Sequence, residues 1–264
     1  MSQGGGGHPS VRGPGGRLLP WLVPALLIAL WQAASATGHI NPRILPSPLE
    51  VLRALARLLM DGELLRNLKA SCGRAGLGFL IGGGIGLALG LATASWRLVE
   101  TLLDTTLQMV RTIPNLALLP LVIIWFGIGE KAKIFLIVCG VTFPIYLNTF
   151  HGIRSVDPNL VGMARVYGLG RLALWRHVIL PGALPSILVG VRFSLGVMWM
   201  TLIVAETIAA SSGLGYMATN AREMMRTDVI VLTILLYALL GKLADVVARA
   251  LERRFLSWRA AGPG

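Results

Sequence analysis

Long apolar stretches alternate with short polar segments through almost the whole chain. The stretches long enough to cross roughly 30 Å of hydrocarbon as a helix lie at 18–36, 75–96, 102–126, 134–151, 187–208 and 228–248. The pattern predicts an all-α fold, a polytopic transmembrane helical bundle of about six spans. Residues 18–248 form the predicted membrane domain, and residues 1–17, rich in Gly, Pro and Arg, are predicted to be a disordered N-terminus.

The first apolar stretch has two interpretations. A signal peptide would need a cleavage site, and Ala33-Ala34-Ser35-Ala36 is a weak one. Further spans follow, so a retained first span is favoured. Six spans place both ends on one side, and the basic residues of segment 152–186 and of the tail 249–264 favour the cytoplasm as that side.

Residues 50–65 have the pattern of an amphipathic helix. Val51, Leu55 and Leu58 recur at helical spacing, and Arg53 lies on the opposite side. The segment is either an interfacial helix or the tilted start of the next span, and the pattern does not distinguish the two.

Small residues and prolines mark two of the spans. Glycine recurs every fourth residue at Gly78, Gly82, Gly86 and Gly90, which places these positions along one ridge of a helix. Such a ridge permits close approach of a neighbouring backbone, so a tightly packed core helix is predicted there. Pro114 and Pro120 interrupt stretch 102–126 and favour a kink.

Composition agrees with a membrane location and narrows the function. The chain has 264 residues, 55% hydrophobic and 14% charged, whereas soluble domains contain about 25% charged residues. The net charge of +12 is spread thinly between apolar stretches, a pattern that argues against nucleic-acid binding. Cys72 and Cys139 lack metal-ligand spacing, and no loop contains a nucleophile or a paired acid and base. No metal site and no enzymatic activity are predicted.

Segment 152–186 is longer than a connection between two spans requires, and it is expected to bind a partner. Leu160 to Tyr167 reads as a short helix with Gly168 as its C-terminal cap. Arg171 to Val178 reads as a second short helix that ends before Pro181.

The same segment resembles the EAA motif of ABC importer permeases, in which Glu-Ala-Ala is followed by a spaced Gly and then by Ile, any residue and Leu-Pro. Ala164, Gly168, Leu180 and Pro181 match, and Val178 stands for the Ile. The match departs at the front, where Gly162 and Met163 replace Glu and the first Ala. The resemblance implies that this loop couples to an ATPase subunit, through Ala164, Tyr167, Gly168, Leu169, Val178, Leu180 and Pro181.

A wider resemblance covers roughly residues 42–256. Segments 45–48 (LPSP), 111–114 (RTIP) and 125–129 (WFGIG) are similar to those of aliphatic-sulfonate permeases, relatives of taurine and nitrate permeases. It implies a homodimer in lipid of the bacterial cytoplasmic (inner) membrane, with two cytoplasmic ATPase subunits and an external solute-binding protein. Gly241-Lys242 is followed by Leu243 and lacks the upstream glycine of a phosphate loop. ATP is therefore expected to be bound by the partner, and the chain is expected to hold no cofactor.

Ionisable residues within the spans are costly and therefore candidates for the solute path. Arg111 could offer a cation to a passing sulfonate, and Glu206 could lie at the outer mouth. A structural ion pair or an interfacial position is the favoured interpretation for both. Taurine, nitrate or a thiamine precursor remain alternative solutes. An ion-gradient-driven transporter is less favoured, because neither inverted repeats nor paired midplane carboxylates are evident.

Overall fold

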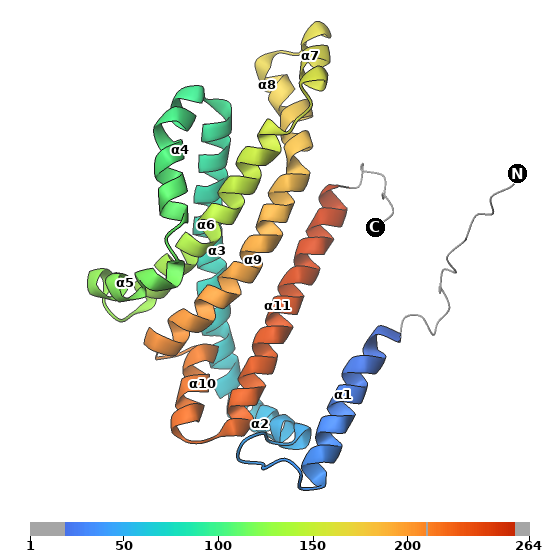
Figure 1. Cartoon of the computed structure of the whole chain (residues 1–264), viewed down its shortest axis with the longest axis vertical. Helices are drawn as coiled ribbons and strands as arrows, with labels where there is room; N and C mark the ends of the chain where they lie inside the picture. Colours follow the sequence, from blue (N-terminus) through green and yellow to red (C-terminus); the bar gives the residue numbers. More distant parts are fainter. Residues whose placement is uncertain (1–18, 210, 257–264) are drawn as a thin grey trace, which may run out of the picture.

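The computed structural model describes residues 19–209 and 211–256, and their regular secondary structure is entirely helical (Figure 1). The all-α prediction is confirmed. The predicted N-terminus 1–17 and the end of the predicted tail lie outside the described residues. The helices are α1 (Leu19–Ala36), α2 (Pro48–Met60), α3 (Glu63–Ser95), α4 (Arg97–Arg111), η2 (Asn115–Leu118), α5 (Leu119–Phe126), α6 (Glu130–Arg154), α7 (Pro158–Val166), α8 (Arg171–Leu174), η3 (Trp175–Ile179), α9 (Leu180–Ala209), α10 (Leu214–Glu223) and α11 (Thr227–Phe255).

Among the residues that the structure describes, four helices are long and apolar enough to cross a membrane: α3, α6, the continuous stretch from α8 to α9, and α11. Stretch 102–126, predicted as one span, is instead a bent pair, because α4 and the helix from Asn115 to Phe126 meet at 83°. Pro114 explains the break, since it has an extended backbone (φ −62°, ψ 120°) and no N–H to donate. Counting the pair as one span gives five, and α1 is a shorter apolar helix.

The core is a layer in which α3 and α9 pack on the two sides of α6. The glycine ridge of α3 faces α6 so closely that a methyl group on Gly82 would lie 2.7 Å from the Val138 carbonyl oxygen. On the other side of α6, a methyl on Gly190 of α9 would lie 2.6 Å from Asn148 Cβ. The predicted close packing of the glycine ridge is confirmed, because these small residues let α3 and α6 approach closely.

Residues 50–65 are divided between two helices. Ser47 caps α2, because its hydroxyl accepts from the Glu50 N–H at 3.2 Å while the Glu50 carboxylate accepts from the Ser47 N–H at 2.7 Å. α2 stops at Met60, and Gly62 takes a positive φ of 69° before α3 begins. The inner face of α2 packs against α10 and α11. The structure therefore supports a helix of its own for residues 50–60, and it excludes the alternative in which this segment is the tilted start of the next span.

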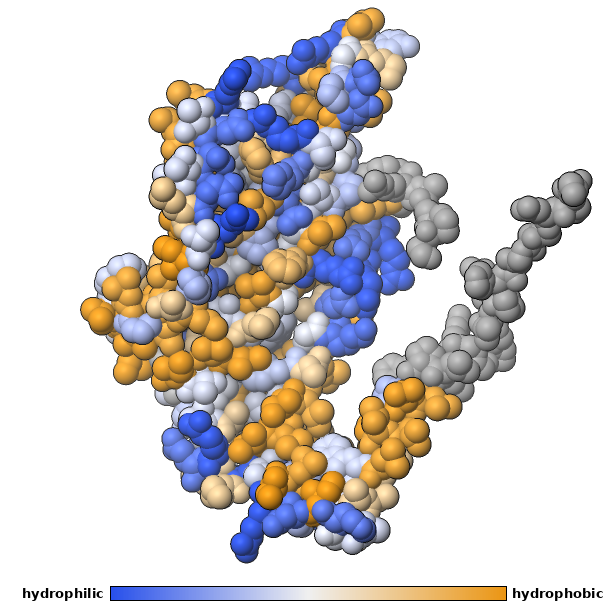
Figure 2. All heavy atoms as spheres, viewed as in Figure 1, coloured by the Kyte–Doolittle hydropathy of each residue, from blue (hydrophilic) through white to orange (hydrophobic). Residues whose placement is uncertain are grey.

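α1 stands apart from this bundle and contacts α2 at its C-terminal end (Figure 1). Most of its described side chains are apolar and exposed, and Figure 2 shows them as an apolar surface. Only lipid or another protein chain could cover that surface.

Candidate functional site

The end of the bundle opposite α2 carries a hairpin formed by α7 and α8 (Figure 1). Asp157 caps α7 by accepting from the Asn159 N–H at 2.8 Å. At the other end of α7, the Leu169 N–H donates to the Ala164 carbonyl at 3.0 Å and the Gly168 N–H donates to the Arg165 carbonyl at 2.9 Å. These two bonds form a Schellman motif, and Gly168 has the positive φ of 79° that the motif requires. The predicted glycine cap is confirmed.

The second short helix does not end before Pro181, so that prediction was wrong. α8 continues through the π-helical turn η3 into α9, and Arg171–Ile208 is one helix of 38 residues. The Leu180 N–H donates to the Trp175 carbonyl five residues earlier. This wider turn directly before Pro181 accommodates a residue that has no N–H to continue the ladder. The connection is therefore shorter than the predicted loop 152–186, because α6 extends to Arg154 and the next long helix already begins at Arg171.

Four of the predicted coupling residues, Ala164, Tyr167, Val178 and Pro181, line a cavity of about 410 Å³ between α7 and the start of α9. Tyr167 is also 79% exposed, beside Gly168 at the tip, so most of its side chain is open to a partner. Leu180 is 43% exposed. The cavity thus brings together Ala164 and Pro181, which are seventeen positions apart in the motif.

Two further tip residues were missed by the sequence analysis. Val166 and Leu172 are 88% and 84% exposed, on either side of Gly168. Apolar side chains in a polar loop were the available signal, but the short helices could have buried them. Exposed apolar residues at a turn are typical of a surface that another protein covers.

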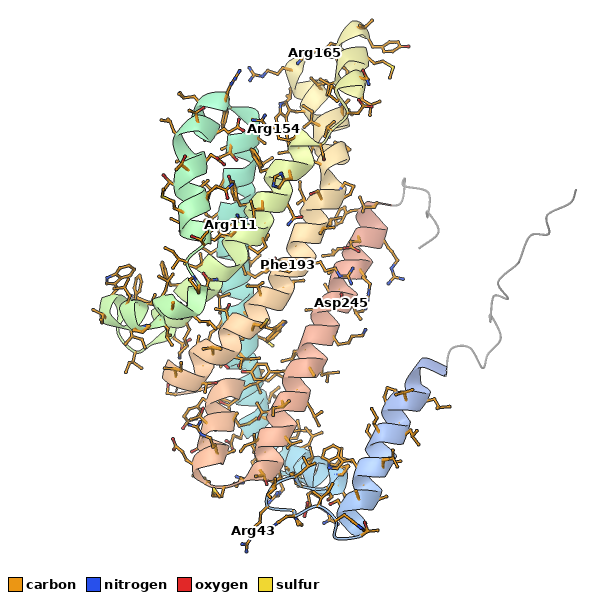
Figure 3. The ribbon with its side chains drawn as sticks, viewed as in Figure 1. Arg43, Arg111, Arg154, Arg165, Phe193 and Asp245 are labelled. Atoms are coloured by element: carbon orange, nitrogen blue, oxygen red, sulfur yellow. The ribbon has the colours of Figure 1, made fainter. Side chains whose placement is uncertain are left out.

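The hairpin surface is also cationic. Arg165, Arg171 and Arg176 are exposed, and Figure 3 shows Arg165 near the tip. None of the three has an ion pair among the described residues. The tip can therefore offer apolar contacts together with charge-assisted hydrogen bonds to a carboxylate-bearing partner.

Glu206 lies near the other end of α9, within a buried ion network. Its carboxylate accepts from Arg74 Nη1 at 2.6 Å, from the Ser71 hydroxyl at 2.7 Å, from the Gly215 N–H at 3.0 Å and from the Tyr237 hydroxyl at 3.2 Å. The Glu206 side chain is fully buried and that of Arg74 is 5% exposed. A buried carboxylate needs this many donors, because an unpaired one would be costly.

Arg74 connects this carboxylate to a second one. Its Nε and Nη2 donate to Glu130 at 2.5 and 2.7 Å, and Lys133 Nζ donates to Glu130 at 2.9 Å. Arg74 also donates to the carbonyl and hydroxyl of Ser212. Two cations and two anions thus join α3, α6, α9 and the connection to α10. Arg74 directly precedes stretch 75–96, and its pairing was not predicted.

Arg111 and Glu206, the predicted path residues, are not brought together. Arg111 is exposed at the end of α4, where Figure 3 shows it, and no hydrogen bond joins it to Glu206. Their part in the solute path stays a prediction. Within the described ranges, no group of three or more His, Cys, Asp and Glu side chains is placed to hold a metal ion.

The chain is similar to a known protein family and to several transport permeases over most of its length. Residues 84–257 match the family described as "Binding-protein-dependent transport system inner membrane component". The "Putative aliphatic sulfonates transport permease protein SsuC" of Escherichia coli is 59% identical over 93% of each chain. The protein of the same name from Bacillus subtilis is 44% identical over 93% of this chain and 91% of its own. The "Taurine transport system permease protein TauC" of E. coli is 38% identical over 89% of this chain and 87% of its own.

Solved structures show the same fold. A crystal structure of an amino acid ABC transporter with histidines matches with a TM-score of 0.64 and 20% identity, over 76% of this chain and 97% of that one. An inward-facing structure of the MetNI methionine ABC transporter matches with a TM-score of 0.57 and 22% identity, over 71% of this chain and 95% of that one.

Proposed function

The chain belongs to the family of binding-protein-dependent transport system inner membrane components, and we propose that its cargo is an aliphatic sulfonate. It is a multi-pass membrane protein, the permease subunit of an ABC importer. The observation that carries the sulfonate proposal is the 59% identity to a sulfonate permease over 93% of each chain, against 38% for the taurine permease.

Energy for transport comes from a partner in this proposal. The sequence has no phosphate-binding loop, so ATP is bound and hydrolysed by two ATPase subunits on the cytoplasmic side, and this chain holds no cofactor. A second copy of the chain completes the membrane channel, and an external binding protein delivers the solute. This arrangement is supported by the family and by the exposed apolar and cationic tip of the α7–α8 hairpin.

The hairpin is suited to passing movement into the membrane. Because α8 and α9 are one helix, a displacement at Arg171 reaches Ile208 without an intervening loop. Glu206 lies near the far end of that helix and is bound to α3 through Arg74. Movement of the ATPase against the tip would therefore be transmitted along this helix to Glu206 and its ion network at the opposite end of the bundle. Such a lever fits alternating access, in which the two sides open in turn.

Uptake by cells tests the cargo. A strain from which the gene for this chain has been deleted should lose uptake of labelled hexanesulfonate, and the restored gene should return it. If the deletion strain keeps sulfonate uptake and loses taurine uptake, the cargo proposal fails and taurine takes its place. If it loses neither, the cargo proposal also fails, and another solute, such as nitrate or a thiamine precursor, takes the place of the sulfonate.

A further inference from the structure

A groove runs between α9 and α11 within the part of the bundle that is apolar enough to cross the membrane. Its volume is about 710 Å³, inside the range of roughly 300–1,000 Å³ typical of small-molecule sites. The wall is formed by Val189, Phe193, Val197 and Met200 of α9 and by Gly241 and Ala244 of α11. Phe193 and Met200 are 63% and 72% exposed, so their apolar surfaces are open to a ligand.

The charged residues that line this groove are Arg192 and Asp245. Arg192 Nε donates to Asp245 Oδ1 at 2.9 Å, and Arg249 Nη2, from outside the lining, lies 2.7 Å from Asp245 Oδ2. Arg249 therefore also balances the Asp245 carboxylate, which leaves the positive charge of Arg192 available to a ligand. Figure 3 shows Phe193 and Asp245 on the neighbouring helices that form the groove.

Arg192 keeps donors for a further acceptor. Only its Nε is bonded to a described residue, and its side chain is 45% exposed. Its two terminal amino groups can therefore donate to an oxyanion while Nε remains on Asp245. Arginine suits this role, because its planar fork binds two oxygens of one anion.

We propose that this groove is a transient binding site for the alkanesulfonate during its passage, with the sulfonate on Arg192 and the alkyl chain against Phe193 and Met200. This inference rests on the proposed cargo. The match is one of shape and charge, since an alkanesulfonate has one singly charged head and an apolar tail. Each buried methylene should tighten binding about fourfold, so longer chains bind better.

Binding to the purified permease and ATPase complex, without the binding protein, tests the site. Labelled ethanesulfonate, butanesulfonate and hexanesulfonate are titrated against the complex in nanodiscs of zwitterionic lipid. Wild type should bind hexanesulfonate tightest. Phe193→Ala should flatten the dependence on chain length, and Arg192→Gln should weaken all three ligands by at least about tenfold, the loss of one charge-assisted contact. Two controls, Leu239→Ala and Arg253→Gln on α11 outside the groove, should bind as wild type does.

Three results would overturn the inference. Equal binding by wild type, Phe193→Ala and Arg192→Gln would place the ligand elsewhere. Absence of binding by wild type, when cells still import hexanesulfonate, would reject the site and leave the proposed cargo intact. Loss of hexanesulfonate binding in nanodiscs containing phosphatidylglycerol, together with retention of that lipid by wild type and not by Arg192→Gln in native mass spectrometry, would identify a lipid site. Failure of the proposed cargo is read separately, from the absence of hexanesulfonate uptake in cells.

Discussion

Removal of Arg74 should destabilise the fold far more than removal of an exposed arginine in a similar pair. Arg74→Gln would leave the fully buried Glu206 carboxylate without a cation, although Ser71, Gly215 and Tyr237 would still donate to it. Breaking a buried pair on one side costs about 3–5 kcal/mol. The three remaining donors place the expected loss near the lower limit, at about 3 kcal/mol.

Arg57→Gln is the matched control, because Arg57 also pairs with a carboxylate, that of Asp228 at 2.8 Å. Its side chain is 60% exposed, so its pair is screened by solvent and contributes about 1 kcal/mol or less. The free energies of unfolding are compared by titration of the detergent-solubilised protein with sodium dodecyl sulfate, followed by tryptophan fluorescence. Arg74→Gln should unfold at a clearly lower fraction of dodecyl sulfate than Arg57→Gln.

The double variant Arg74→Gln with Glu206→Gln sharpens the test. Removing both charges leaves neutral groups in hydrogen-bonding positions, so it should be more stable than Arg74→Gln alone. Equal stability of Arg74→Gln and Arg57→Gln would refute the reasoning, because burial would then have no effect on the value of the pair. A double variant less stable than Arg74→Gln would show that Glu206 contributes through groups other than Arg74.

Four further outcomes are expected. Gly168→Val, at φ 79°, should strain the hairpin by about 1–2 kcal/mol, weaken ATPase pull-down and abolish uptake, whereas Gly170→Val, at φ −64°, should change neither; equal effects would reject the cap argument. Gly82→Ala should lower the free energy of unfolding by about 1–3 kcal/mol, because the added methyl group separates α3 from α6. Gly84→Ala, with open space around it, should unfold at the same fraction of dodecyl sulfate as wild type. The purified chain alone should hydrolyse no ATP, and hydrolysis free of contaminating ATPase would contradict its role. A cysteine at Gly170 should be protected from an impermeant thiol reagent in intact cells and one at Glu63 should react, and the reverse labelling would invert the topology.

Periodicity and spacing were sufficient for the spans within α3, α6, α9 and α11 and for the hairpin cap. Every predicted apolar stretch except 102–126, which is broken at Pro114, falls on a single helix in the described residues, because a segment in lipid must satisfy its own backbone. Gly168 could be predicted because few residues tolerate its positive φ, and a short helix ending in Gly is a local signal. The glycine ridge of α3 could also be predicted, because a glycine at every fourth position is a pattern within a single helix.

What could not be predicted depends on contacts between distant segments. The partner of Glu206 is Arg74, which is 132 residues away, and no local pattern identifies such a pair. The continuity of α8 with α9 was missed because Pro181 usually ends a helix, and a π-helical turn that absorbs a proline has no clear sequence signal. The 83° bend between α4 and α5 was foreseen only as a kink, because the angle depends on how α5 packs against α6.

Transport by reconstituted components tests the central claim most directly. Proteoliposomes are prepared with this permease and its ATPase subunits, the binding protein is supplied on the outside, and ATP is enclosed on the side of the ATPase. The account predicts that labelled hexanesulfonate accumulates only when permease, ATPase, ATP and binding protein are all present, and that Gly168→Val abolishes accumulation while Gly170→Val does not. Accumulation by the permease alone, driven by an ion gradient without ATP, would contradict it.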